Sequence, residues 1–235
     1  MKLTLRALAA LLGYPSGELQ AHIGEVRDAL REEAALPRTA MRRLEPLLGR
    51  FETGDLLDLQ SDYSELFDRS RKLSLHLFEH VHGDSRERGQ AMIDLGQQYA
   101  ERGFFLEGGE LPDFVPVFLE FASCLEPPEA REMLGQPAHV FAALAERLDA
   151  RKAAYGGIFH ALVALAGVRP DREALAELDE RTPSDDPANI DEEWEEAPVS
   201  FNSAGSHAMG GPTGVVAKIR AARRPVNDKP EGVAR

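Results

Sequence analysis

The chain has 235 residues, an apolar fraction of 43% and a formal net charge of −13. This length and composition allow one sizeable buried core, whereas the excess of acidic side chains argues against a nucleic-acid-binding protein and favours a basic partner. Cys124 is the only cysteine, which excludes an intramolecular disulfide and a zinc site built from several thiolates.

The sequence gives no reason to expect a membrane span or a secretion signal. No apolar run approaches the roughly 18 residues that a spanning helix needs. Near the N-terminus, Arg6 interrupts the leucines and alanines, and no small-residue cleavage site follows. We therefore expect a protein that stays in the cytoplasm.

Apolar residues recur at intervals of three and four along the first 170 residues, which is typical of amphipathic helices separated by glycine or proline. The expected helices lie within residues 3–12, 16–30, 37–49, 55–67, 84–103, 113–125, 127–136, 137–148 and 155–167. Alternating runs of β-branched residues bounded by turns are absent from the sequence. The pattern predicts an all-α single domain over residues 1–170.

Short polar side chains stand ahead of several expected helices and could accept hydrogen bonds from the first-turn N–H groups. Ser16 and Asp55 precede the second and fourth segments, and Asp113 precedes the segment rich in phenylalanine. For the helix that contains Tyr99, either Asp84 or Ser85 is the expected N-cap.

The character of the chain changes after residue 170. Residues 171–198 contain twelve acidic and two basic residues, a net of −10, and residues 199–235 carry a net of +4. We expect residues 171–181 to form an acidic helical extension. Residues 182–235 are too poor in large apolar groups to offset the entropy of ordering, so we expect a largely disordered C-terminal tail. Trp194 is an apolar group of this tail that could contact the body or a partner.

The sequence His76-Leu-Phe-Glu-His80 matches the inverted zincin pattern H-x-x-E-H. On a helix, histidines four residues apart share a face and could both bind zinc, with Glu79 as general base. A third ligand would have to come from elsewhere, with Glu110, Glu120 and Glu126 as candidates. A zinc-dependent hydrolase is therefore the alternative function. Cys124, with no histidine nearby in sequence, is expected in the core.

The same part of the chain also fits a binding surface. Tyr63, Leu66 and Phe67 fall on one helical face with Asp68 at its margin, and Phe78 stands beside Glu79. Two carboxylates, Asp113 and Glu120, accompany the helix rich in phenylalanine. An acidic rim around an apolar groove is complementary to a peptide that carries basic residues beside apolar ones. The alternative is that the apolar residues are core, and for Leu66 this alternative is favoured.

Several motifs resemble one known family. They are Tyr63-x-x-Leu-Phe-Asp-Arg69, Ser74-Leu-His-Leu-Phe-Glu-His-Val-His-Gly83, Arg86-x-Arg-Gly-Gln-Ala-Met92, Glu110-Leu-Pro-Asp113 and Glu192-Glu-Trp-Glu-Glu-x-Pro-Val-x-Phe201. These motifs are similar to those of the NarJ family of nitrate reductase molybdenum cofactor assembly chaperones, which are related to the TorD and DmsD chaperones. The related TorD and DmsD pattern often has histidine after the aspartate, where this chain has Phe114.

The resemblance implies a TorD-like helical bundle that acts as a cytoplasmic chaperone and is not itself an enzyme. Such chaperones bind the N-terminal segment of the apo nitrate reductase catalytic (alpha) subunit. They keep it competent for insertion of the molybdenum cofactor and an iron-sulfur cluster before membrane docking. Proteins that deliver the molybdenum cofactor are further candidate partners. The resemblance implies no metal and no cofactor for the chaperone itself.

Together with the binding-surface interpretation, the resemblance predicts which residues recognise the partner. The predicted recognition residues are Tyr63, Leu66, Phe67, Asp68, His76, Phe78, Glu79, His80, Asp113 and Glu120. A partner helix would place apolar side chains in the groove while its basic residues pair with the acidic rim.

Overall fold

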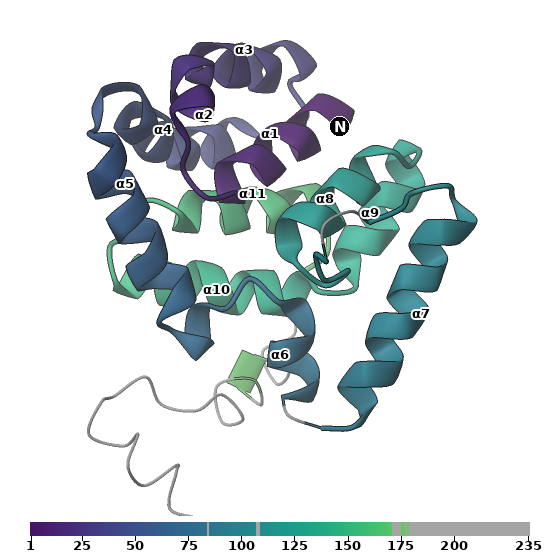
Figure 1. Cartoon of the computed structure of the whole chain (residues 1–235). Coiled ribbons are helices and arrows are strands. Elements are labelled where there is room, and N and C mark those ends of the chain that lie inside the picture. The colour runs from purple at the N-terminus through teal and green to yellow at the C-terminus, as the bar shows by residue number, and fades with distance from the viewer. Residues whose placement is uncertain (84, 107–108, 171–174, 177, 179–235) are drawn as a thin grey trace, which may run out of the picture. The chain divides into compact units, whose positions relative to one another are not determined.

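The computed structural model describes residues 1–83, 85–106, 109–170, 175–176 and 178. Throughout these residues the ordered elements are helices and no strand is present, which confirms the expected all-α single domain (Figure 1). Within the same residues, no helix is long and apolar enough to cross a membrane. Residues 175, 176 and 178 are helical, but the rest of the predicted acidic extension and the whole predicted tail lie outside the described residues.

The helices carry the labels of Figure 1, and two shorter turns are called η1 and η2. In chain order they are α1 (Lys2–Leu12), α2 (Gly17–Ala21), α3 (Ile23–Glu33), α4 (Arg38–Thr53), α5 (Leu56–Tyr63), the π-helical turn η1 (Ser64–Asp68), the 3-10 turn η2 (Arg71–Leu73), α6 (Leu77–His82), α7 (Glu87–Glu101), α8 (Val115–Ser123), α9 (Pro127–Gly135), α10 (Ala138–Ala150) and α11 (Gly156–Ala166).

Helix α11 forms the centre of the core and packs against α4, α9 and α10. Its residues are apolar on nearly all sides, as expected for a helix with no solvated face, and Ile158, Phe159 and Leu162 are completely buried. Gly157 lies against the backbone of α4, where an added Cβ would overlap the carbonyl group of Arg43. Glycine at this position therefore allows the close crossing of α11 over α4.

Helix α1 packs along α8, and its N-terminal end is fastened to α3 by Glu33. The Glu33 carboxylate accepts hydrogen bonds from the Thr4 hydroxyl at 2.6 Å and from the backbone nitrogens of Leu3 and Thr4, and it pairs with the N-terminal ammonium group. Burial by itself raises the pKa of Glu33, but these donors outweigh it and lower the pKa to about 2.

Two of the expected helix starts are confirmed. The Ser16 hydroxyl accepts a hydrogen bond from the nitrogen of Leu19, and the Asp55 carboxylate accepts one from the nitrogen of Leu57. The expected end of the third segment at Gly49 is wrong: α4 continues to Thr53 because the next turn buries Phe51 completely.

Two further local predictions also differ from the structure. Ser85 does not cap α7, which begins after Arg86 without a side-chain cap, and Asp84 lies outside the described residues. The prediction that Cys124 is a core residue is wrong, since its side chain is exposed at the end of α8.

Candidate functional site

The aromatic residues at the end of α5 lie in the interior. Tyr63 and Phe67 are 5% and 7% exposed, and their rings pack against each other and against Tyr155. The Tyr63 hydroxyl donates a 2.9 Å hydrogen bond to the carbonyl of Leu12. These two predicted recognition residues therefore lie in the core beneath the predicted recognition surface and are not part of that surface.

Their neighbours in η1 reach the surface. Leu66 is half-buried and packs on the core, and Asp68 is exposed at the end of the turn. Of these three residues of the π-helical turn, Phe67 is buried, Leu66 is partly covered by the core, and only Asp68 is exposed to solvent.

Two extended segments meet between α6 and α8. His76 and Phe114 form an isolated antiparallel bridge, in which Leu77 donates to the carbonyl of Asp113 at 3.0 Å and Val115 donates to the carbonyl of Leu75 at 2.8 Å. His76 therefore has extended backbone, and α6 begins one residue later. The expectation that His76 and His80 share one helical face is wrong, because tertiary pairing holds His76 outside the helix.

Asp113 joins these segments through its side chain. Its carboxylate is completely buried and accepts hydrogen bonds from the backbone nitrogen of Phe78 at 3.0 Å and from Nδ1 of His76 at 3.1 Å. Asp113 was expected to cap the helix that follows it, but it caps α6, and Phe114 occupies the N-cap position of α8. A carboxylate at this place satisfies a first-turn N–H group of α6 and complements its positive end.

The imidazole beside Asp113 comes from a distant part of the chain. The half-buried ring of His76 lies against the ring of Phe114, with centroids 5.3 Å apart and planes inclined at 33°. The sequence pattern has no histidine directly after the aspartate, yet the fold brings one to the same carboxylate. The rings of Phe114 and His76 therefore lie together at the surface, each half-buried.

His80 has a structural role in the interior. It is 5% exposed, and its Nε2 donates to the carbonyl of Ser74 at 2.8 Å. Burial lowers the pKa of His80, although the Ser74 carbonyl and neighbouring carboxylates oppose this effect. Because this nitrogen is occupied and His76 lies outside the helix, the geometry required by the zinc-hydrolase alternative is not formed. Across the described ranges, no group of three or more His, Cys, Asp or Glu side chains could hold a metal ion.

Glu79 is partnered within the chain. Its carboxylate accepts a hydrogen bond from Arg88 at 3.0 Å, which joins α6 to α7, and both side chains are partly exposed. On the same short helix, the ring of Phe78 lies edge-on against the ring of His82 at 5.5 Å. Glu79 and Phe78 thus lie at the surface, but Glu79 already takes part in an ion pair.

Glu120 lines a hollow between α1 and α8. The hollow has a volume of about 320 Å³ and is lined by Arg6, Ala10, Phe104, Glu120, Ser123 and Cys124. Burial raises the pKa of Glu120, and the nearby charge of Glu110 raises it further, whereas Arg6 lowers it. The carboxylates of Glu120 and Glu110 exceed the single positive charge of Arg6 here, and this excess beside the apolar side chains of Ala10 and Phe104 favours a further positively charged group with an apolar stem.

Comparison with known proteins places the chain in a family. Residues 17–161 match the sequence model of the nitrate reductase delta subunit family. The chain belongs to this family. It is 42% identical over 195 residues to the nitrate reductase molybdenum cofactor assembly chaperone NarJ of Escherichia coli K12, with 83% of each chain covered. It is also 37% identical over 202 residues to NarW of the same strain, whose name carries the same assembly-chaperone description, with 84% of this chain and 83% of NarW covered.

The fold of this delta subunit family member also matches a solved structure. A redox enzyme maturation protein from Archaeoglobus fulgidus superposes with a TM-score of 0.53 at 19% sequence identity, covering 72% of this chain and 94% of that chain. The resemblance to the NarJ family and the predicted TorD-like bundle are thus confirmed, by sequence relatives for the family and by this structure for the fold.

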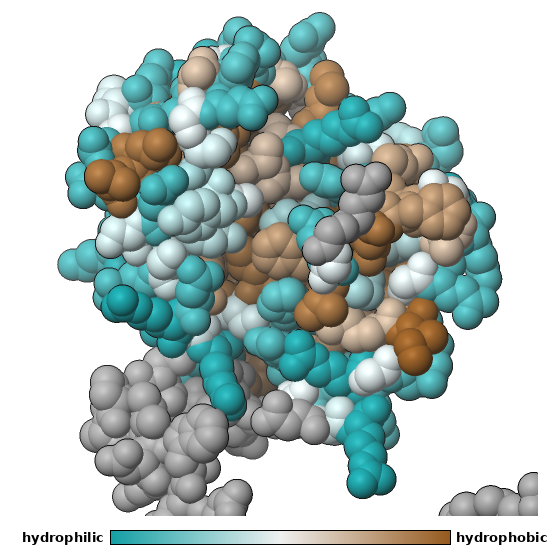
Figure 2. Space-filling view, in the orientation of Figure 1, coloured by the Kyte–Doolittle hydropathy of each residue, from teal (hydrophilic) through white to brown (hydrophobic). Residues whose placement is uncertain are grey.

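Sequence reasoning missed a set of exposed apolar side chains in this member of the family. Ile93, Phe105 and Leu111 are 62%, 74% and 43% exposed, and Phe104, next to Phe105, lines the hollow that contains Glu120. Figure 2 shows apolar side chains gathered on the face that carries α1, α8 and the upper end of α7. Helical periodicity could not reveal Phe105 and Leu111, because both lie in the connection between α7 and α8.

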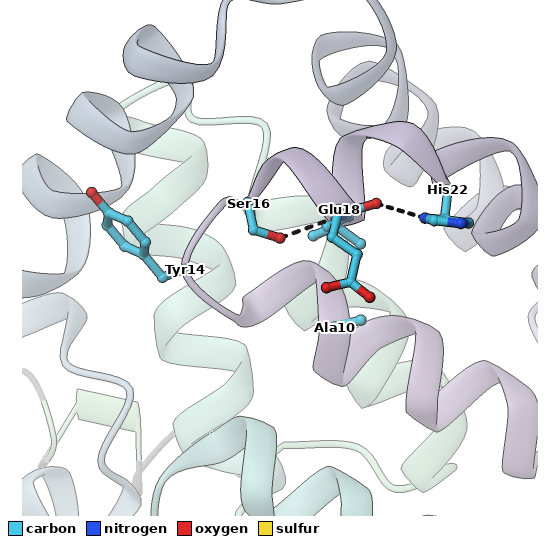
Figure 3. Close-up of a pocket in the computed structure, with 6 residues that line it drawn as sticks. Ala10, Tyr14, Ser16, Glu18 and His22 are labelled. Carbon is cyan, nitrogen blue, oxygen red and sulfur yellow. Dashed lines mark hydrogen bonds between the residues drawn. The ribbon is translucent and has the colours of Figure 1, made fainter.

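A second hollow, of about 340 Å³, lies where α1 leads into α2 (Figure 3). The polar groups of its lining serve α2: Ser16 accepts from Leu19, and the His22 ring donates to the carbonyl of Glu18 at 2.8 Å. The exposed ring of Tyr14, which also lines it, lies edge-on against Tyr63. This hollow therefore borders the packed rings of Tyr63, Phe67 and Tyr155, which we call the aromatic cluster.

Proposed function

We propose that the protein is a cytoplasmic assembly chaperone, not an enzyme, for a respiratory nitrate reductase. It binds the N-terminal segment of the apo catalytic subunit and keeps that subunit competent for insertion of its molybdenum cofactor and iron-sulfur cluster before membrane docking. The observation that carries this proposal is the 42% identity to the assembly chaperone NarJ over 83% of both chains. The absence of a formed zinc geometry among the described residues gives the hydrolase alternative no support.

The proposed recognition surface divides the predicted residues into two groups. Those at the surface contact the partner: Leu66, Asp68, His76, Phe78, Glu79 and Glu120. Those in the interior hold that surface in shape: Tyr63, Phe67, His80 and Asp113. Because Asp113 fixes the start of α6, it determines where His76 and Phe78 present their rings.

Apolar contacts supply most of the affinity in this proposal. Exposed Ile93 in α7, Phe105 after α7, and Leu111 two residues before Asp113 add apolar area, and large apolar side chains left in water commonly mark binding sites. An amphipathic partner helix lays its apolar face on such a surface. A few of these contacts then carry most of the binding free energy.

Charge sets the orientation of the bound segment. A lysine or arginine of the partner enters the hollow beside Glu120, where its positive charge favours the ionised carboxylate and offsets the effect of burial. The acidic balance of the chain also increases the rate at which a basic segment associates.

Titration calorimetry with a synthetic peptide that matches the N-terminus of the cognate catalytic subunit tests the proposal. We expect binding at about micromolar affinity or tighter by metal-free protein. Glu120→Gln weakens binding most at low salt, whereas Glu32→Gln, an equal charge change at an exposed position of α3, does not. Absence of binding by the folded protein, together with one tightly held zinc ion in metal analysis, would overturn the proposal.

A further inference from the structure

The hollow that contains Glu120 also contains a positive charge that is held in place. Arg6 is exposed on α1, and its Nε donates a hydrogen bond at 3.3 Å to the buried hydroxyl of Ser123, the last residue of α8. The Ser123 hydroxyl itself donates to the carbonyl of Glu120 at 2.6 Å, so its proton is used and it accepts from Arg6. These hydrogen bonds fix the guanidinium group at the C-terminal end of α8, where the helix dipole favours a positive charge.

Most of the hydrogen-bonding capacity of Arg6 is unused. A guanidinium group has several N–H donors, and within the described part of the chain only the donor on Nε has a partner. The carboxylates of Glu120 and Glu110 take part in no ion pair or side-chain hydrogen bond among the same residues. Burial raises the pKa of Glu120, and the charge of Arg6 is close enough to oppose this effect. The hollow therefore presents a positive and a negative group that are near each other and unpaired.

The positions of the two groups match the spacing of side chains on a helix. Arg6 lies on α1 and Glu120 on α8, and these helices pack side by side (Figure 1). The axes of packed helices are about 8–10 Å apart. On a bound helix, side chains one turn apart share a face, with Cβ atoms about 5–6 Å apart. Two long side chains at this spacing therefore reach both sides of the hollow, and Ala10, one turn after Arg6, leaves room between them.

A partner that brought only positive charge would be attracted by Glu120 and repelled by Arg6. We propose that the hollow binds two oppositely charged side chains of the partner helix, an acidic one on Arg6 and, one helical turn away, a basic one on Glu120. This inference rests on the proposed function, because the occupant is the N-terminal segment of the catalytic subunit, and it adds an acidic residue to what that segment must carry. Arg6 is then a specificity-determining residue: its planar fork binds a carboxylate through two hydrogen bonds and disfavours purely basic segments.

Cys124, the only cysteine of the chain, lines the hollow and is exposed, so its reactivity reports whether the hollow is filled. Titration calorimetry gives the affinity of the synthetic N-terminal peptide for the full-length protein. Alkylation of Cys124 by iodoacetamide is then timed with and without saturating peptide, and we expect the bound peptide to slow it. Binding with an unchanged alkylation rate would contradict this inference while the proposed function stands. Absence of binding by the folded protein would contradict both.

A double-mutant cycle at low salt identifies the charge pair. We expect Arg6→Gln to weaken binding about fivefold, and replacement of the peptide's acidic residue by its amide to do the same. The two changes together weaken binding no further, because each removes the same contact. Arg38→Gln, an equal charge change at an exposed position of α4, leaves the affinity unchanged. Multiplied effects of the two changes, or tighter binding by Arg6→Gln, would overturn the inference.

The parent protein provides a second test should Arg6→Gln fail to fold. Reversal of the peptide's acidic residue to lysine places a positive charge against Arg6, so we expect weaker binding, with the difference reduced at high salt. Equal or tighter binding of the reversed peptide would overturn the inference. So would a cognate segment that has no acidic residue within one helical turn of a basic one.

Discussion

The buried carboxylate of Asp113 lies 3.0 Å from the backbone nitrogen of Phe78, 35 residues earlier in the chain. This hydrogen bond joins the two stretches, residues 74–83 and 110–113, that most resemble the chaperone family. It fixes the start of α6 to the segment before α8 and thereby sets the surface on which a partner is proposed to bind.

Replacement of Asp113 tests this relationship. Asp113→Ala leaves a buried first-turn N–H group of α6 without an acceptor, so we expect the free energy of unfolding to fall by about 2 kcal/mol. Asp113→Asn retains one acceptor oxygen and loses less. Urea denaturation measures both values, and an Asp113→Ala protein as stable as the parent would contradict this role.

The two buried tyrosines of the aromatic cluster provide a matched pair. Tyr63→Phe removes a hydroxyl that bonds to the Leu12 carbonyl, so we expect a loss of about 1 kcal/mol. Tyr155→Phe removes a buried hydroxyl that has no partner within the described part of the chain, so we expect no loss or a slight gain. Equal losses in thermal or urea unfolding would show that the hydrogen bond to Leu12 adds nothing.

The stability of the protein depends on pH through His80. Burial lowers the pKa of His80 in the folded protein, so the unfolded chain binds its proton more readily. The stabilising contribution is therefore complete above about pH 6.5 and is lost as the pH falls below that value. His80→Gln, which keeps an N–H donor without titrating, flattens the decline between about pH 7 and pH 5. His22→Gln is the comparison: its hydrogen bond to the Glu18 carbonyl raises the pKa of His22, so its loss does not flatten the decline at low pH. An unchanged pH profile in His80→Gln would contradict the prediction.

The positive and negative charges of the Glu79–Arg88 ion pair can be swapped between the two positions by mutation. Glu79→Lys places two positive charges together at the junction of α6 and α7, and we expect a loss of about 1 kcal/mol because the pair is partly exposed. We also expect Glu79→Lys to weaken binding of the peptide from the N-terminus of the catalytic subunit. Adding Arg88→Glu restores the pair and recovers stability, which urea unfolding measures. If peptide binding stays weak in the exchanged protein, Glu79 contacts the partner directly; if stability does not recover, the ion pair has no role.

The helices could be predicted from the sequence because their periodicity and caps are local properties. The caps at Ser16 and Asp55 each act within three residues, and both predictions are confirmed. Asp113 shows where local reasoning stops. Its position ahead of a helix indicated a local cap, but its carboxylate serves a helix 35 residues earlier, and only tertiary structure reveals that exchange.

The candidate site was predictable by residue type but not by exposure. The sequence grouped His76 and Glu79 with Asp113 in one predicted recognition set, and the fold brings His76 to the Asp113 carboxylate. The extended backbone of His76, however, depends on its pairing with Phe114. Similarly, the exposure of Phe105 depends on how the connection between α7 and α8 packs. These outcomes arise from long-range contacts that helical periodicity does not encode.

The most direct test of the central claim is the molybdenum content of the cognate nitrate reductase catalytic subunit, purified from cells that lack their own assembly chaperone. The chaperone proposal predicts low molybdenum content without this protein, restoration when it is supplied, and weaker restoration with the Glu120→Gln variant. Unchanged molybdenum content with or without the folded protein would contradict a role in assembly of the enzyme.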